Sequence, residues 1–180
     1  MPKFLQVVKQ EKSEIVKCFI LLALYTGARK RNVLTMEWSN IDFAKKIWHI
    51  PKTKNGKSQD VPLTDDAMEI LQGMKVTSKW VLPSDTSKSG HLESPDKTWR
   101  KICAKAGIEN LRIHDLRRTL ASCLADFGAS QHTIGIVLNH DDLKTTSIYA
   151  RVSLKAVRQY MSKVTQMMNE CTDRVQCTLM

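Results

Sequence analysis

One apolar stretch near the amino terminus constrains the fold more than any other feature of the sequence. From Ile15 to Tyr25 every side chain is hydrophobic except Lys17. The stretch is well short of the roughly 20 residues that a helix needs to cross a bilayer, and Thr26-Gly27 follows it as a stop signal. The pattern predicts a buried helix over about residues 12–25 that ends at Gly27.

A short region in the middle of the chain changes from helical to strand-like patterning. Residues 46–51 and 58–63 are short runs of the kind found in strands. Between them lies Thr53-Lys54-Asn55-Gly56, and an Asn-Gly pair is typical of tight hairpin turns. The sequence therefore predicts a small antiparallel sheet.

Helical patterns account for most of the remaining chain. A second short helix is expected over residues 29–38, with Val33, Leu34 and Met36 directed toward the core. Residues 83–95 are rich in Ser, Gly, Asp and Lys and predict an exposed loop. Further helices are predicted at about residues 64–74, 96–106, 114–127, 130–138, 143–149 and 153–168. The expected fold class is α+β, mainly α-helical with a small antiparallel β-sheet.

The excess of basic side chains indicates a polyanionic partner. The 180 residues include 28 Lys plus Arg against 18 Asp plus Glu, which gives a formal net charge of +10. Nucleic acid is the partner that this excess favours. Membrane binding is disfavoured because we find no basic amphipathic helix with exposed large apolar residues and no lipidation signal. The first residues also lack the features of a secretory signal, so we expect a cytoplasmic protein.

The cysteines give no sign of a disulfide framework or a metal site. They are odd in number and scattered, with no C-x-x-C pair and no histidine at zinc spacing. We expect reduced thiols, no bound metal and no cofactor. The five are Cys18, Cys103, Cys123, Cys171 and Cys177.

Six ionisable side chains occur in contexts that matter more together than singly. Taken alone, each is an ordinary surface or packing residue. Arg29 ends the segment Thr26-Gly27-Ala28-Arg29, and Lys54 lies in the predicted turn eight positions before Pro62. The six are Arg29, Lys54, His114, Arg117, His140 and Tyr149.

The later four residues lie in three short motifs. His114 and Arg117 belong to His-Asp-Leu-Arg, a spacing that places both on one helical face. His140 ends Leu138-Asn139-His140, and Tyr149 follows nine positions later at the end of Thr145-Thr146-Ser147-Ile148-Tyr149. In order, spacing and context, residues from about 3 to 160 resemble the tyrosine recombinase, or phage integrase, family. The resemblance implies the catalytic-domain fold of these DNA breaking-rejoining enzymes.

The resemblance also implies a role for each side chain. Arg29 and Arg117 are expected to clamp the scissile phosphate, because arginine keeps its charge and offers a planar fork to phosphate oxygens. Tyr149 is the expected nucleophile, forming a 3′-phosphotyrosine, and Lys54 is suited to protonate the leaving 5′-oxygen. His140 is expected to donate a hydrogen bond to the same phosphate, and His114 to accept a proton or to position the nucleophile. The implied function is site-specific recombination at duplex DNA attachment sites without ATP or metal.

Two positions depart from the family pattern. Asn32 stands where the family usually has an acidic residue, so a carboxylate that supports the site is missing. Asn139 stands where the family favours Gly before the second histidine. Asn is the next most tolerant residue in left-handed turns, so the second substitution is expected to change little.

The resemblance sets expectations for domains and assembly. Residues 1–180 are expected to form a single catalytic domain, with a core over about 3–160 and a tail over about 153–180. The helical core-binding domain that usually precedes it is expected to be absent. The predicted helix over 153–168 has two interpretations: it packs on its own core, or it docks on a neighbouring protomer in a DNA-bound tetramer.

Two rival functions stay open at this point. A type IB topoisomerase shares the chemistry of Arg, Lys, His and Tyr but relaxes supercoils without exchanging partners. A non-enzymatic DNA-binding module would keep the fold, yet it has no need of Tyr149 or Lys54 in these contexts. The remaining tyrosines and histidines lack such contexts and are expected to be packing or surface residues; they are Tyr25, Tyr160, His49, His91 and His132.

Overall fold

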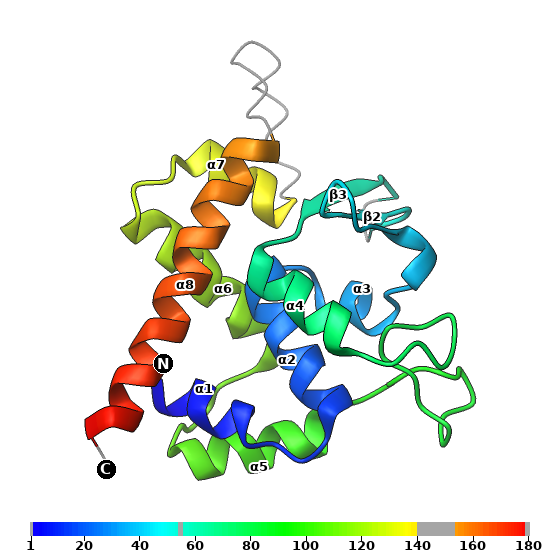
Figure 1. Cartoon of the computed structure of the whole chain (residues 1–180), viewed down its shortest axis with the longest axis horizontal. Helices are drawn as coiled ribbons and strands as arrows, with labels where there is room; N and C mark the ends of the chain where they lie inside the picture. The colour runs from blue at the N-terminus through cyan, green and yellow to red at the C-terminus, as the bar shows by residue number, and fades with distance from the viewer. Residues whose placement is uncertain (1, 54–55, 140–153, 179–180) are drawn as a thin grey trace.

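Helices surround a central buried helix, and a small sheet lies at one side (Figure 1). The computed structural model describes residues 2–53, 56–139 and 154–178. The helices are α1 (Pro2–Lys9), α2 (Glu14–Thr26), α3 (Lys30–Leu34), the 3-10 helix η1 (Trp38–Asn40), α4 (Asp65–Gly73), α5 (Asp96–Ala106), α6 (Ile113–Asp126), α7 (Gln131–Leu138) and α8 (Leu154–Thr178). The strands are β1 (Ile41–Asp42), β2 (Ile47–Ile50) and β3 (Gln59–Pro62). The predicted α+β class is confirmed.

Helix α2 is the buried helix that the apolar stretch predicts. Ser13 caps its start, with the side-chain oxygen accepting a hydrogen bond from the Val16 amide at 3.4 Å. Its end is Gly27, which adopts the left-handed conformation with φ of 62°. The helix packs against α3, α4, α6 and α8. Its predicted end at Gly27 is confirmed, and this end leads directly into the candidate site.

The predicted hairpin forms an antiparallel three-stranded sheet in the order β1-β2-β3. In the register, Trp48 pairs with Val61 and His49 with Asp60. Strand β1 was not predicted, because two residues are too short to show an alternating pattern. Lys54 and Asn55, at the tip of the hairpin, lie outside the described residues.

The predicted helix over 29–38 is wrong in its second half. Helix α3 ends at Leu34 because the chain then pairs with a distant segment. The Met36 carbonyl accepts the Val81 amide at 2.8 Å, and Glu37 forms a β-bridge with Trp80. The side chains of Val33, Leu34 and Met36 are buried as predicted. Long-range pairing has here overridden the local helical pattern.

Helix α8 runs ten residues beyond its predicted end at about residue 168 and packs on its own chain. Val157, Met161, Val164 and Met168 are buried against the core. The helix lies beside α1 (Figure 1). Helix α1 itself was not among the helices predicted from the sequence. The structure shows this segment packed on its own core, and its docking on a neighbouring protomer stays a prediction. The predicted helix over 143–149 lies outside the described residues.

The other predicted helices are confirmed to within one or two residues at each end. Cys18 and Cys103 are buried free thiols, and Cys123 is a partly buried one.

Among residues 2–53, 56–139 and 154–178, no helix combines the length and apolar character needed to cross a membrane.

Candidate active site

Arg29 lies at the junction between α2 and α3. Its Nη2 donates a hydrogen bond to the Asn139 carbonyl oxygen at 3.3 Å, which ties the junction to the end of α7. Its Nη1 is buried and has no hydrogen-bond acceptor among the residues that the structure describes. Buried donors are nearly always paired in folded proteins. An unpaired guanidinium nitrogen therefore marks a place where an acceptor from outside the fold can bind.

The packing and the backbone conformation of the turn before Arg29 favour glycine at position 27. A Cβ on Gly27 would lie 2.7 Å from Leu120 Cδ2 and 3.4 Å from Leu138 Cδ2. Its φ of 62° also disfavours any side chain. The missing side chain lets α6 and the end of α7 approach this turn closely. Three segments distant in sequence therefore converge beside Arg29.

Arg117 reaches the same turn from α6. Its side chain is buried, with 6% exposed, and its Nη1 donates a hydrogen bond to the Gly27 carbonyl oxygen at 2.5 Å. Burial, and to a smaller extent the nearby Arg29 charge, lowers the pKa of Arg117 to about 10. The guanidinium is still charged at neutral pH. The structure thus brings together two of the six predicted residues, Arg29 and Arg117.

The arginine pair, Arg29 and Arg117, has no counter-ion in the described part of the chain. The ion pairs there join other residues, and none includes either arginine. Two like charges held close together at low exposure repel each other, and burial removes the solvation that each would have in water. An anion that binds both would relieve this cost. The geometry therefore fits an oxyanion such as a phosphate.

His114 lies on α6 one turn before Arg117 and is exposed. The start of this helix is fixed by Asp115, whose carboxylate accepts the Arg112 amide at 2.9 Å. That hydrogen bond is the largest of the effects that lower the pKa of Asp115. His114 is therefore presented at the surface above the buried Arg117, on the same helix as predicted.

The three other predicted residues, Lys54, His140 and Tyr149, lie outside the described residues. The backbone that leads into and out of the Lys54 turn is described. The Thr53 amide donates to the Lys57 carbonyl at 2.8 Å, and the Gly56 amide donates to the Thr53 carbonyl at 2.9 Å. These two hydrogen bonds join the described residues on either side of positions 54 and 55. His140 directly follows Asn139, which ends α7.

Two asparagines, Asn32 three positions after Arg29 and Asn139 in contact with it, were not predicted as donors. Their side-chain amide nitrogens are buried and have no hydrogen-bond acceptor in the described part of the chain. Asn139 adopts the left-handed conformation with φ of 46°, as the sequence suggested for this position. A sequence signal existed, since both are departures from the family pattern, but the pattern does not show where the amides point.

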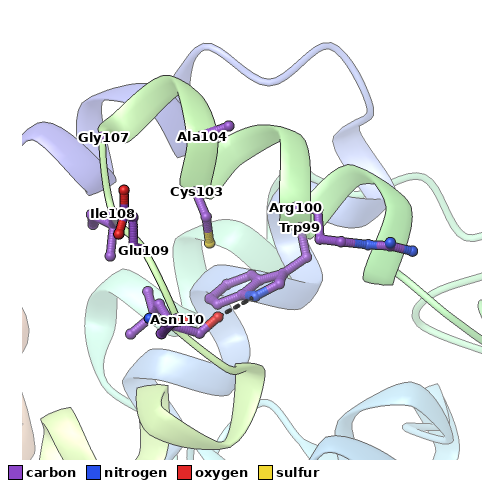
Figure 2. Close-up of a pocket in the computed structure, with 9 residues that line it drawn as sticks. Trp99, Arg100, Cys103, Ala104, Gly107, Ile108, Glu109 and Asn110 are labelled. Atoms are coloured by element: carbon purple, nitrogen blue, oxygen red, sulfur yellow. Dashed lines mark hydrogen bonds between the residues drawn. The ribbon is translucent and has the colours of Figure 1, made fainter.

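A separate cavity of about 490 Å³ lies between α5 and the segment that leads into α6 (Figure 2). None of the predicted site residues lines it. Trp99 Nε1 donates a hydrogen bond to the Leu111 carbonyl at 2.9 Å across one side of it. This contact holds the segment before α6 against α5 and so helps to place the helix that carries Arg117.

Comparison with known proteins places the sequence in one family. The sequence matches the phage integrase family over residues 1–156. A shufflon-specific DNA recombinase of Escherichia coli is 34% identical over 120 residues, which are 67% of this chain and 30% of that protein. The tyrosine recombinase XerA of Saccharolobus solfataricus is 30% identical over 161 residues, which are 87% of this chain and 51% of that protein. The chain spans about half or less of the length of these two relatives.

Solved structures show the same fold. The integrase from mycobacterium phage Brujita superposes with a TM-score of 0.74 at 21% identity, over 88% of this chain and 54% of that chain. The XerH site-specific recombinase bound to its difH substrate superposes with a TM-score of 0.63 at 20% identity, over 88% of this chain and 47% of that chain. The catalytic-domain fold expected from the sequence is therefore confirmed. With its match over residues 1–156, this chain belongs to the phage integrase family, the family of the tyrosine recombinases.

Proposed function

We propose that this chain catalyses the strand cleavage and rejoining steps of site-specific DNA recombination. The observation that carries the proposal is the arginine pair, a buried Arg117 beside a half-buried Arg29, neither with a carboxylate partner in the described residues. A DNA phosphodiester gathers additional negative charge on its non-bridging oxygens during attack. Two guanidinium groups fixed to one backbone turn can meet that charge without first rearranging.

The proposed reaction transfers the scissile phosphoryl group from the 5′-oxygen to Tyr149 and then to the 5′-hydroxyl of another strand. The Tyr149 hydroxyl loses its proton and its oxygen attacks the scissile phosphorus, while the bond to the 5′-oxygen breaks. Lys54 gives a proton to the leaving 5′-oxygen, and His114 accepts the proton from Tyr149 or positions its hydroxyl. His140 donates to the phosphate. A 5′-hydroxyl of another strand then attacks the 3′-phosphotyrosine and releases Tyr149, so no ATP is consumed.

The partner in this proposal is duplex DNA carrying an attachment site. A net charge of +10 favours such a polyanion, and the relatives are named as recombinases and integrases. We infer that residues 1–180 act as one catalytic domain in the cytoplasm and self-associate on DNA, with α8 as the contact. Sedimentation with and without DNA checks the last point, and a monomer under both conditions contradicts it.

The test is trapping of the covalent adduct. The protein is incubated at low ionic strength with nicked duplexes that have a randomised central segment, and adducts are resolved on a denaturing gel. The nick lets the short 5′-fragment diffuse away, so the phosphotyrosine accumulates. We expect an adduct whose DNA, when sequenced, reveals the preferred site.

Two variants make the result specific to Tyr149. Tyr149→Phe removes only the hydroxyl oxygen and is expected to abolish the adduct. Tyr160→Phe makes the same change on α8 and is expected to leave the adduct unchanged. If the wild-type chain forms no adduct at protein concentrations that bind all the DNA, the proposed function is wrong, and a non-catalytic DNA-binding module becomes the better description.

A further inference from the structure

We propose that the side-chain amide of Asn139 is an additional phosphate-binding group of this active site. In this proposal its Nδ2 donates a hydrogen bond to a non-bridging oxygen of the scissile phosphate, next to Arg29. The proposal rests on the proposed function and adds to it a contact that the glycine usual at this position of the family has no side chain to make.

The first support is a pair of unpaired donors on two residues that touch. The Asn139 carbonyl accepts a hydrogen bond from Arg29 Nη2 at 3.3 Å. Within residues 2–53, 56–139 and 154–178, the other terminal nitrogen of that guanidinium, Nη1, is buried without an acceptor, and so is the amide nitrogen of Asn139. Leaving a buried donor unpaired destabilises the fold. Two such donors, on residues that a hydrogen bond already joins, are the basis for proposing a common acceptor that arrives with the ligand.

The second support is the conformation that presents the amide. Asn139 has φ of 46° and ψ of 57°, and its backbone N–H donates to the Ile136 carbonyl at 3.1 Å. This left-handed turn ends α7 and fixes the direction in which the side chain leaves the backbone. A branched or longer side chain is strained there, whereas Asn is tolerated. The position therefore accommodates a short amide held at a fixed angle beside Arg29.

Charge explains why an amide suits this place. Arg29 and Arg117 already repel each other, and the Arg29 charge helps to lower the pKa of Arg117. A third cation would add to that repulsion, and a carboxylate would pair with Arg29 and compete with the phosphate. A neutral N–H donor does neither. It adds a hydrogen bond to the anion without changing the charge of the site.

Two substitutions at Asn139 separate a phosphate contact from a turn-forming role. Asn139→Gly keeps the left-handed backbone and removes only the amide, and Asn139→Asp keeps the shape but replaces the N–H donor with an anionic oxygen. The measurement is the rate of adduct formation with DNA in saturating amount, using the site recovered with the wild-type chain. We expect Asn139→Gly to be slower by about tenfold to a hundredfold, and Asn139→Asp to be slower still. Thermal unfolding is expected to change little for the glycine variant.

A phosphorothioate at the scissile position identifies the oxygen that the amide contacts. Sulfur keeps the charge of the phosphate but accepts hydrogen bonds weakly. We expect one diastereomer to slow the wild-type chain without slowing Asn139→Gly further, because the contact is already lost, and the other to slow both equally.

Three results overturn the proposal while leaving the proposed function intact. One is a wild-type adduct rate that Asn139→Gly matches to within about twofold. Another is an Asn139→Asp variant as active as wild type, since a purely turn-forming residue tolerates Asp. The third is an Asn139→Gly defect that both diastereomers leave unaltered. By contrast, the absence of any wild-type adduct contradicts the proposed function itself.

Discussion

The polar side chains that join α8 to α2 and α4 are buried to a similar extent as those of the arginine pair, but the two groups differ in their hydrogen-bond partners. The Tyr25 hydroxyl donates to Asn169 Oδ1 at 2.9 Å, and the Asn169 amide donates to Asp66 Oδ1 at 2.6 Å. The Thr165 hydroxyl donates to Asp66 Oδ2 at 2.8 Å. We call these four residues the α8 cluster. Each donor in this series has an acceptor within the fold.

The arginine pair shows the opposite arrangement. Arg29 and Arg117 lie close together with like charge, and Arg29 Nη1 has no acceptor among the described residues. A satisfied polar group stabilises the fold that contains it, whereas an unsatisfied one costs stability until a ligand completes it. From this contrast we propose that the α8 cluster serves stability and that the arginine pair serves binding. Substitutions in the two regions should therefore affect different measurements.

The largest effect is expected from Arg117→Lys. Lysine keeps the positive charge but loses the planar fork, so it cannot donate both to the Gly27 carbonyl and to a phosphate in the same geometry. We expect the rate of adduct formation to fall by about a hundredfold to a thousandfold, with a smaller loss of DNA affinity. The rate is measured in a single turnover with the nicked duplex.

Arg118→Lys is the matched control for this prediction. Arg118 follows Arg117 on α6 but is exposed and lies 3.4 Å from Asp115 Oδ1. Surface pairs of this kind contribute little, so the control is expected to cleave at the wild-type rate. Equal losses in the two variants would break the comparison, because the buried position would then have no special role.

The sequence predicts the arginine pair well and the α8 cluster hardly at all. Arg29 and Arg117 lie in local motifs, Thr-Gly-x-Arg and His-x-x-Arg, and a glycine before the first arginine already suggests a tight turn. Asp66 and Asn169 are 103 positions apart, and no local pattern links an acid in a helical first turn to an amide near the end of the chain. Only the fold brings them together.

The same reasoning explains the other differences. Helix α3 ends early because Met36 pairs with Val81, a partner that a local period does not reveal. The left-handed turn at Asn139 was expected from residue type alone, because few residues tolerate it. The unpaired amide of that residue was not expected, since a pattern shows which donors exist but not which acceptors surround them.

Asn169→Ala tests the other side of the comparison. It removes an acceptor from Tyr25 and a donor from Asp66, leaving both without that partner. We expect the free energy of unfolding to fall by about 1–3 kcal/mol, with an unchanged rate of adduct formation at temperatures where the variant is folded. Urea denaturation gives the first quantity and the nicked duplex the second.

The neighbouring residue supplies a control for the α8 cluster. Glu170 is exposed and accepts a hydrogen bond from Gln166 one turn earlier at 2.7 Å. Glu170→Ala is therefore expected to change the free energy of unfolding by less than about 0.5 kcal/mol. A cleavage defect in Asn169→Ala that exceeds its stability loss would instead connect the α8 cluster to the reaction.

The smallest effect concerns the pH dependence of stability through Tyr25. Burial raises the pKa of this phenol to about 12, while the unfolded chain keeps a pKa of about 10. Above about pH 10 the unfolded state loses the proton first, so the unfolded state binds fewer protons than the folded state and stability falls as pH rises. At about pH 11 the loss from this residue is about 1.4 kcal/mol.

Comparison of wild type with Tyr25→Phe isolates this contribution, because other groups titrate in the same range. The lowered pKa of Arg117 acts in the opposite direction, since the folded state there gives up its proton before the unfolded state does. Both chains carry Arg117, so its effect cancels in the difference. Urea denaturation between about pH 8 and pH 11 should show a difference in unfolding free energy that is constant at first and shifts in favour of Tyr25→Phe above about pH 10. A difference that stays constant across the whole range would mean that the folded state does not raise the pKa of the Tyr25 phenol. The burial of this phenol within the α8 cluster would then be contradicted.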